Sequence, residues 1–104
     1  MLNILLICSA GMSTSLMVAK MQKVSEEIGF ESNIWAVATD SAVENMEKAD
    51  VILLGPQIRF MLDGISEKAK KFNIPVAVIN FNDYGTCNGK AILIQALNLK
   101  KAGV

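Results

Sequence analysis

The chain has 104 residues, of which 52% are hydrophobic and 19% charged, and its 10 basic and 10 acidic side chains leave no net charge. This length suits one domain over residues 1–104 with a core that needs neither a disulfide nor a metal, and the zero net charge argues against nucleic acid as a partner. The chain has no histidine, which is the usual general base and the commonest metal ligand, so we expect neither a metal nor a cofactor.

The first half of the chain alternates apolar runs of strand length with helical patterns. Residues 2–7 are nearly all apolar, which is typical of a strand buried on both faces. A helix is predicted over residues 13–28, with Gly29 as its stop. Residues 34–38 form a weaker strand flanked by polar residues, as at a sheet edge.

The second half repeats this alternation. Ser41, with Glu44 three residues later, forms a capping-box pattern that predicts a short helix ending near Lys48. The remaining predicted elements are a strand over 51–55, a helix over 57–72, a strand over 76–81 and a helix over 89–101.

This alternation predicts the fold class. Strands and helices in turn are typical of an open parallel sheet with helices on both faces. Right-handed crossovers and a central first strand predict a three-layer α/β fold with four parallel strands in the order 2-1-3-4, which is a short flavodoxin-like fold. Ligands of such sheets bind at the carboxyl ends of the strands, so the loops that follow the strands should carry the function.

The apolar segments are too short to cross a membrane. An uninterrupted run such as residues 51–55 is far below the roughly 20 residues that a membrane span needs. Residues 1–8 have no basic leading residue and no cleavage site of the secretory kind. We therefore expect a cytoplasmic protein in which Cys8 and Cys87 are thiols.

The segment after the first strand has the composition of an anion site. Backbone N–H groups at the start of a helix, together with the helix dipole, suit a dianionic tetrahedral group. The residues expected to line this site are Ser9, Ala10, Gly11, Met12, Ser13, Thr14 and Ser15. Whether the hydroxyl groups or the backbone N–H groups bind the anion stays open. Cys8 lies at the mouth, where a thiolate would be stabilised, and we favour a nucleophile over a small buried residue that ends a strand.

The same segment carries no charge. No side chain before Lys20 is charged, and the sequence has neither the Gly-Lys-Ser/Thr of a Walker loop nor the G-x-G-x-x-G of a dinucleotide site. Cysteine phosphatases use a Cys-x5-Arg loop, and here Thr14 stands at the arginine position. Without that cation a phosphoryl group on Cys8 is better placed to be passed on than to be hydrolysed.

Three segments together carry a resemblance to a known family. LLICSAGMSTS at residues 5–15, ADVILLGPQIRFML at residues 49–62 and DYG at residues 83–85 resemble the enzyme IIB component of the lactose/cellobiose (chitobiose) class of the bacterial phosphoenolpyruvate-dependent sugar phosphotransferase system. The resemblance covers essentially the whole chain. It implies the fold that this family shares with phosphotyrosine phosphatases of the low-molecular-weight type.

The resemblance also implies a function. Cys8 would accept a phosphoryl group from a phosphohistidine of the IIA partner, and the backbone of residues 10–15 would cradle it. Cys8 would then give the group to a sugar, a β-linked disaccharide of the cellobiose, chitobiose or lactose type, that the membrane-embedded IIC partner imports. The chain would act as a monomer in the cytoplasm and reach the inner face of the membrane only transiently.

The sequence also suggests a docking rim for partners and an alternative function. We expect partners to contact Met12, Pro56, Gln57, Asp83 and Tyr84, although Gln57 is equally compatible with capping its own helix. The alternative function is a low-molecular-weight phosphatase or an arsenate-reductase-like enzyme that uses Cys8, with Asp83 as the general acid. The missing arginine argues against it, and Cys87 is expected to be an ordinary thiol.

Overall fold

The computed structural model describes residues 1–9 and 11–102, without the side chains of residues 11–14. In chain order the elements are β1 (Leu2–Cys8), α1 (Gly11–Glu27), β2 (Ser32–Ala38), the 3-10 turn η1 (Thr39–Ser41), α2 (Ala42–Met46), β3 (Val51–Leu54), the 3-10 segment η2 (Pro56–Met61), α3 (Leu62–Ala69), the 3-10 turn η3 (Lys70–Phe72), β4 (Val76–Val78), α4 (Phe81–Gly85) and α5 (Gly89–Ala102).

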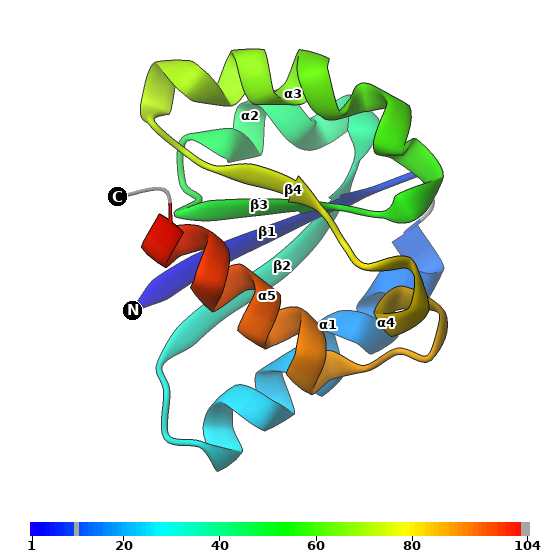
Figure 1. Cartoon of the computed structure of the whole chain (residues 1–104), viewed down its shortest axis with the longest axis vertical. Coiled ribbons are helices and arrows are strands. Elements are labelled where there is room, and N and C mark those ends of the chain that lie inside the picture. Colours follow the sequence, from blue (N-terminus) through cyan, green and yellow to red (C-terminus); the bar gives the residue numbers. More distant parts are fainter. Residues whose placement is uncertain (10, 103–104) are drawn as a thin grey trace.

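The four strands form one parallel sheet in the order β2-β1-β3-β4, so the predicted fold class and strand order are confirmed. β1 is central: Ile4 pairs with Ile34 of β2 on one side and with Val51 of β3 on the other. Helices α2 and α3 cover one face of the sheet, whereas α1, α4 and α5 cover the other (Figure 1).

Side chains alternate along β1 between two cores, as the pleat of a strand requires. Ile4 and Leu6 belong to the core under α1 and α5, and Leu5 and Ile7 belong to the core under α2 and α3. Continuing this alternation, Cys8 lies on the α1 and α5 side. The run of apolar residues in β1 therefore fills both cores and places the cysteine at the end of the central strand.

Helix α1 is bounded differently from the prediction. It begins at Gly11 rather than at residue 13, which shortens the connection from Cys8. It ends in a Schellman arrangement, in which Gly29 N–H donates to Glu26 (3.1 Å) and Phe30 N–H donates to Ser25 (2.9 Å). Gly29 has φ 71°, so the predicted stop is confirmed.

Two predicted helix features are wrong. Ser41 makes no side-chain capping bond, because the chain enters α2 through η1. The Ser41 carbonyl instead accepts a hydrogen bond from the side-chain Nδ2 of Asn45 at 2.8 Å. The helix predicted over residues 57–72 is α3 with a 3-10 segment at each end. It departs from helical geometry at Ile58 (φ −114°, ψ 24°), whose side chain is buried.

The strand predicted over residues 76–81 ends early. β4 stops at Val78, because Asn80 caps α4: its Oδ1 accepts from the N–H groups of Asn82 (3.0 Å) and Asp83 (3.2 Å). The segment between this strand and the last predicted helix begins with the short helix α4. Phe81 becomes a helical surface residue instead of the last residue of a strand.

Gln95 of α5 covers the outer edge of β4. Its Nε2 donates to the Val78 carbonyl at 2.8 Å, and its Oε1 accepts from the Asn80 N–H at 3.2 Å. Ile79, between these two residues, bonds inward to Leu54 of β3. The side-chain amide therefore makes the pair of bonds that a residue of a further parallel strand would make at this edge.

Candidate functional site at the end of the central strand

Cys8 lies where β1 ends between its two neighbours. It pairs with Ala38 of β2, and the Ile7 carbonyl beside it accepts from Gly55 N–H after β3 at 2.8 Å. The residue is 2% exposed, and its Sγ lies 4.0 Å from the Val37 carbonyl oxygen. Backbone pairing thus fixes Cys8 on both sides at the carboxyl edge of the sheet, which is where ligands of this fold bind.

The expected anion site lies at the junction between β1 and α1. Ser9 and Ser15 are exposed, and Gly11 is the first residue of the helix. Ala10 lies outside the described residues, as do the side chains of Met12, Ser13 and Thr14. The first turn of α1 contains no acidic residue, so no carboxylate competes for its N–H groups.

Gly55 and Gln57 complete the wall next to Cys8. A Cβ atom on Gly55 would lie 3.2 Å from the Gln57 Oε1 and 3.5 Å from the Cys8 Cβ, which places the amide of Gln57 beside the cysteine. Gln57 is exposed and does not cap η2, since no side chain makes that capping bond. Pro56, also expected at the docking rim, is buried and offers little surface to a partner.

The segment after β4 supplies the opposite side of a cleft. Asp83 and Tyr84 of α4 are both half-buried, and Tyr84 N–H donates to the Asn80 carbonyl at 2.9 Å. The cleft has a volume of about 330 Å³, and its lining residues are Leu16, Met17, Gln57, Tyr84, Gly85 and Cys87. Residues from the ends of three strands therefore meet here, as the parallel topology predicts.

Cys87 has a different setting from Cys8. It is half-buried, its φ is 54°, and its Sγ lies 3.9 Å from the Met17 Sδ. Neither cysteine is part of a disulfide in the described chain. Cys87 follows α4 rather than a strand of the sheet, so the structure holds it in the cleft wall and not at a strand end.

Large apolar side chains surround this end of the molecule, and the sequence reading did not single them out. Leu16 is 57% exposed, Phe60 79% and Phe81 73%. They belong to α1, η2 and α4, which follow β1, β3 and β4 and lie at the same end of the sheet (Figure 1). In the helix predicted over residues 57–72, one face is apolar and packs in the core: Ile58, Met61, Leu62, Ile65 and Ala69. Phe60 falls outside this face, and that spacing was the sign in the sequence that its side chain is exposed.

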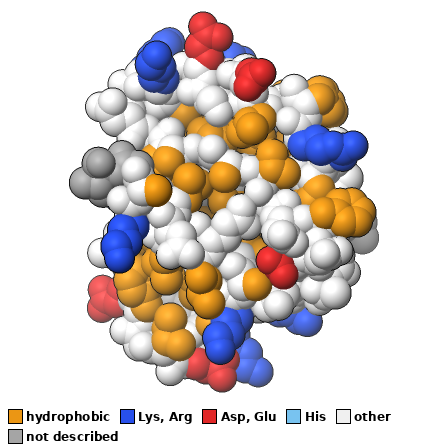
Figure 2. Space-filling view, viewed as in Figure 1, with side chains coloured by type: hydrophobic (Ala, Val, Ile, Leu, Met, Phe, Trp, Pro, Cys, Tyr) orange, Lys and Arg blue, Asp and Glu red, His pale blue; other side chains and the backbone are white. Residues whose placement is uncertain are grey.

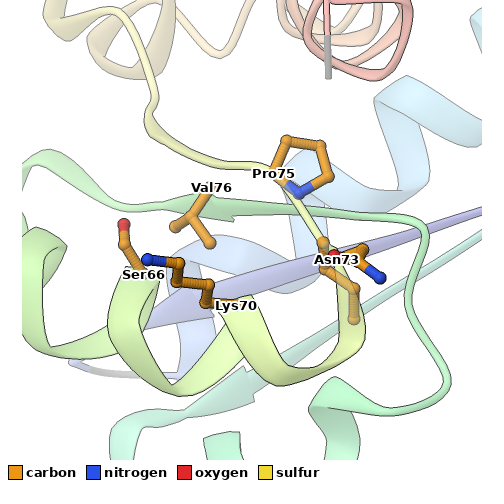
Figure 3. A pocket seen from close by; sticks show the side chains of 6 residues that line it. Ser66, Lys70, Asn73, Pro75 and Val76 are labelled. Atoms are coloured by element: carbon orange, nitrogen blue, oxygen red, sulfur yellow. The ribbon is translucent and has the colours of Figure 1, made fainter. Parts of the chain in front are cut away.

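Other cavities lie away from Cys8. One of about 340 Å³ is lined by residues including Ser66, Lys70 and Val76, at the amino end of β4 (Figure 3). In a parallel sheet this is the edge opposite to the one that carries Cys8. Among the described residues, no group of three or more His, Cys, Asp or Glu side chains could hold a metal ion.

The surface and the helices add two observations. On the face drawn in Figure 2, blue and red side chains lie mostly near the margin and are mixed in sign, while apolar side chains gather between them. No helix in the described part of the chain has both the length and the apolar character needed to span a bilayer.

Known proteins match this chain over most of its length. A family described as "PTS system, Lactose/Cellobiose specific IIB subunit" matches residues 3–95. The oligo-beta-mannoside-specific EIIB component of Bacillus subtilis is 48% identical over 95% of this chain and 96% of its own length. The galactose-specific EIIB component of Lactococcus lactis subsp. cremoris is 44% identical over 92% of this chain and 94% of its own.

Solved structures give the same picture. The cellobiose-specific phosphotransferase IIB component of Borrelia burgdorferi is 39% identical, with a TM-score of 0.81 over 98% of this chain and 94% of that one. The lactose-specific IIB domain of Streptococcus pneumoniae, at 16% identity, shares the fold with a TM-score of 0.85 over 94% of this chain and 96% of that one. The fold and site define a small flavodoxin-like α/β protein with a cysteine at the end of its central strand. The chain belongs to the lactose/cellobiose-specific IIB family of the phosphotransferase system.

Proposed function

We propose that the chain is a phosphocarrier that works through Cys8. Its Sγ accepts a phosphoryl group from a phosphohistidine of a IIA partner, and later gives the group to a hydroxyl of a sugar held by a membrane IIC partner. The observation that carries the proposal is the position of Cys8 at the end of β1, next to the first turn of α1, which has no acidic residue.

Both phosphoryl transfers use the same groups of the site, the Cys8 thiolate and the N–H donors around it. In the first, the thiolate attacks phosphorus while the bond to the imidazole nitrogen breaks. In the second, the sugar hydroxyl oxygen attacks phosphorus as the S–P bond breaks, the hydroxyl proton passes to water, and the thiolate is restored. No described side chain next to Cys8 is a strong acid or base, so we attribute catalysis to positioning and to N–H donors of residues 9–15. Thr14, in place of the phosphatase arginine, supports transfer to a partner over hydrolysis.

We propose that partners dock on the apolar rim around the cleft. The rim consists of Leu16, Gln57, Phe60, Phe81, Asp83 and Tyr84; Met12 is a further candidate from the sequence. Exposed aromatic and aliphatic side chains suit a protein interface. The buried Pro56 is left out of this surface.

The cellular location of the proposed transfer follows from the two partners. We propose that the chain, as one domain and a monomer, works in the cytoplasm and reaches the inner face of the membrane only when it docks on IIC. The relatives named as specific for oligo-beta-mannoside and for cellobiose support a sugar of the β-linked disaccharide type, whereas the name of the galactose-specific relative refers to a monosaccharide. Discrimination among sugars then belongs to IIC.

The test is to follow the phosphoryl group itself. The chain is incubated with phosphoenolpyruvate, the general phosphotransfer proteins and IIA, and its mass is measured before and after. We expect one added phosphoryl group, located on Cys8 by peptide mapping, that is lost in Cys8→Ser and kept in Cys87→Ser. A label on another residue, or one that survives Cys8→Ser, would overturn the proposal.

A further inference from the structure

The side-chain amide of Gln57 lies close to Gly55, where a side chain on residue 55 would press on it. The Oε1 of Gln57 and the Cβ of Cys8 both lie within 3.5 Å of the point where a side chain on residue 55 would begin. Gly55 is itself buried, with its N–H bonded to Ile7 at 2.8 Å, so this point is fixed to the end of β1. The amide and the residue that bears the proposed nucleophile therefore border the same small space beside Gly55.

Gln57 has no structural task that would explain this position. It makes no capping bond to η2, and its amide forms no hydrogen bond within the described chain. The other two glutamines differ: Gln22 donates to the Ser32 carbonyl, and Gln95 bonds to β4. An amide that is held beside Cys8 with its donor unused is available to a group bound there.

The chemistry of the site calls for such a donor. A phosphoryl group on sulfur presents oxygens with two negative charges, and no side chain before Lys20 is charged. The N–H groups at the start of α1 approach from the loop after β1, whereas Gln57 comes from the segment after β3. Rotation of the amide plane by half a turn places Nε2 where Oε1 now lies, so the donor can face Cys8 without backbone movement.

We propose that Gln57 is a catalytic residue of both transfers, and that its Nε2 donates a hydrogen bond to an oxygen of the phosphoryl group on Cys8. This rests on the proposed function of Cys8. Gln57, which follows β3, would supply a neutral hydrogen-bond donor to the phosphoryl group. The loop after β1 lacks the arginine that phosphatases use for this purpose. Gln57 thus touches the transferred group in addition to lying on the rim that meets the partners.

The first test measures the rate of phosphoryl transfer from phosphorylated IIA to the chain. Gln57→Leu removes the donor, and we expect a loss of about tenfold to a hundredfold, as for one hydrogen bond to a charged group. Gln57→Glu, which has similar size but carries a negative charge, should lose more. Asn98→Leu, which removes an exposed amide of α5 far from Cys8, is the matched control and should transfer at the rate of the unmodified chain.

Binding separates this role from docking. The affinity of unphosphorylated Gln57→Leu for IIA should fall by much less than the rate of transfer, because that complex loses only the rim contact of Gln57 and has no phosphoryl group on Cys8 that could lose a hydrogen bond. If the affinity falls as far as the rate, Gln57 is only a docking residue and the inference is wrong. If the rate is unchanged while Cys8 is still labelled, the inference is also wrong, and the function of Cys8 stands.

A direct readout is available from the amide itself. In spectra of ¹⁵N-labelled protein, the side-chain NH₂ of Gln57 should shift when Cys8 is phosphorylated, while those of Gln22 and Gln95 serve as internal references. An unchanged Gln57 signal in protein shown by mass to be phosphorylated would contradict the contact. If the unmodified chain takes up no label on Cys8, the failure is that of the proposed function.

Discussion

Gly89, the first residue of α5, lies against the backbone of Lys20 in α1. A Cβ atom on Gly89 would lie 2.8 Å from the Lys20 carbonyl carbon, 2.9 Å from its Cβ and 2.9 Å from the Met21 nitrogen. Most of these atoms are backbone and cannot move aside alone. The glycine thus sets the distance between the two helices that cover the Cys8 side of the sheet.

Gly89→Ala should therefore destabilise the protein despite the better helix propensity of alanine. We expect the free energy of unfolding to fall by about 1–3 kcal/mol, since the helices must separate to admit a methyl group. Urea titration followed by circular dichroism measures the change. Gly64→Ala, in α3, is the control: nothing lies within 4 Å of its Cβ position, so it should gain about 0.5–1 kcal/mol. Equal effects at both positions would contradict the contact.

Gly55→Ala tests the wall beside Cys8. Its methyl group would meet the flexible end of Gln57 at 3.2 Å and Cys8 at an ordinary contact distance of 3.5 Å. The amide can turn away at small cost, so we expect a change in stability below about 1 kcal/mol together with transfer to Cys8 that is slowed several-fold. Unfolding and transfer are measured on the same preparation, and transfer at an unchanged rate would show that the position of the amide is unimportant.

Asn80→Ala tests how α4 is held at the rim. The change removes the two bonds to Asn82 and Asp83 and should cost about 1 kcal/mol of stability, as for other helix N-caps. Asn80→Asp keeps an acceptor oxygen, so its free energy of unfolding should fall by only a few tenths of about 1 kcal/mol. Faster hydrogen exchange of the Asp83 amide in Asn80→Ala, with little change in Asn80→Asp, is the local sign of a lost cap.

Gln95→Leu tests the edge of β4. The change breaks the bonds to Val78 and Asn80, and we expect about tenfold faster exchange of the Asn80 amide, which then bonds only to water. The open edge should also favour association, which sedimentation at increasing concentration detects. Gln22→Leu, which loses a single bond of 3.3 Å to Ser32, is the comparison and should leave the Asn80 amide protected.

The sequence was sufficient for the parts of the fold that depend on long apolar patterns. The alternation of apolar runs and helical spacing predicted a parallel sheet in the order 2-1-3-4, and the run at residues 2–7 predicted a strand buried on both faces. The same logic predicts that ligands bind at the carboxyl edge, which is the edge at which Cys8 ends β1. The strands follow from burial, which leaves a strong periodic signal, and their order follows from the handedness of the crossovers.

Features that depend on single hydrogen bonds were missed. Ser41 and Glu44 have the spacing of a capping box, but η1 delivers the chain to α2 with Ser41 at φ −105° and ψ 5°. Phe81 extends the apolar run of β4, yet the cap of Asn80 and its bond to Gln95 turn the chain before it. Gln95 lies 15 positions from Asn80 in the sequence, and no local sequence pattern indicates the hydrogen bond between them.

The central position of β1 has a consequence for the lifetime of the site. Ile4, Leu5, Leu6 and Ile7 are all completely buried, two in each core, and the strand bonds to a neighbour along both edges. Separating β1 from the sheet would open both cores at once, so this strand should open only when the whole chain unfolds. If a stored sample takes up less of the proposed phosphoryl group while Cys8 is chemically intact, we therefore expect that it has lost folded molecules in the same proportion.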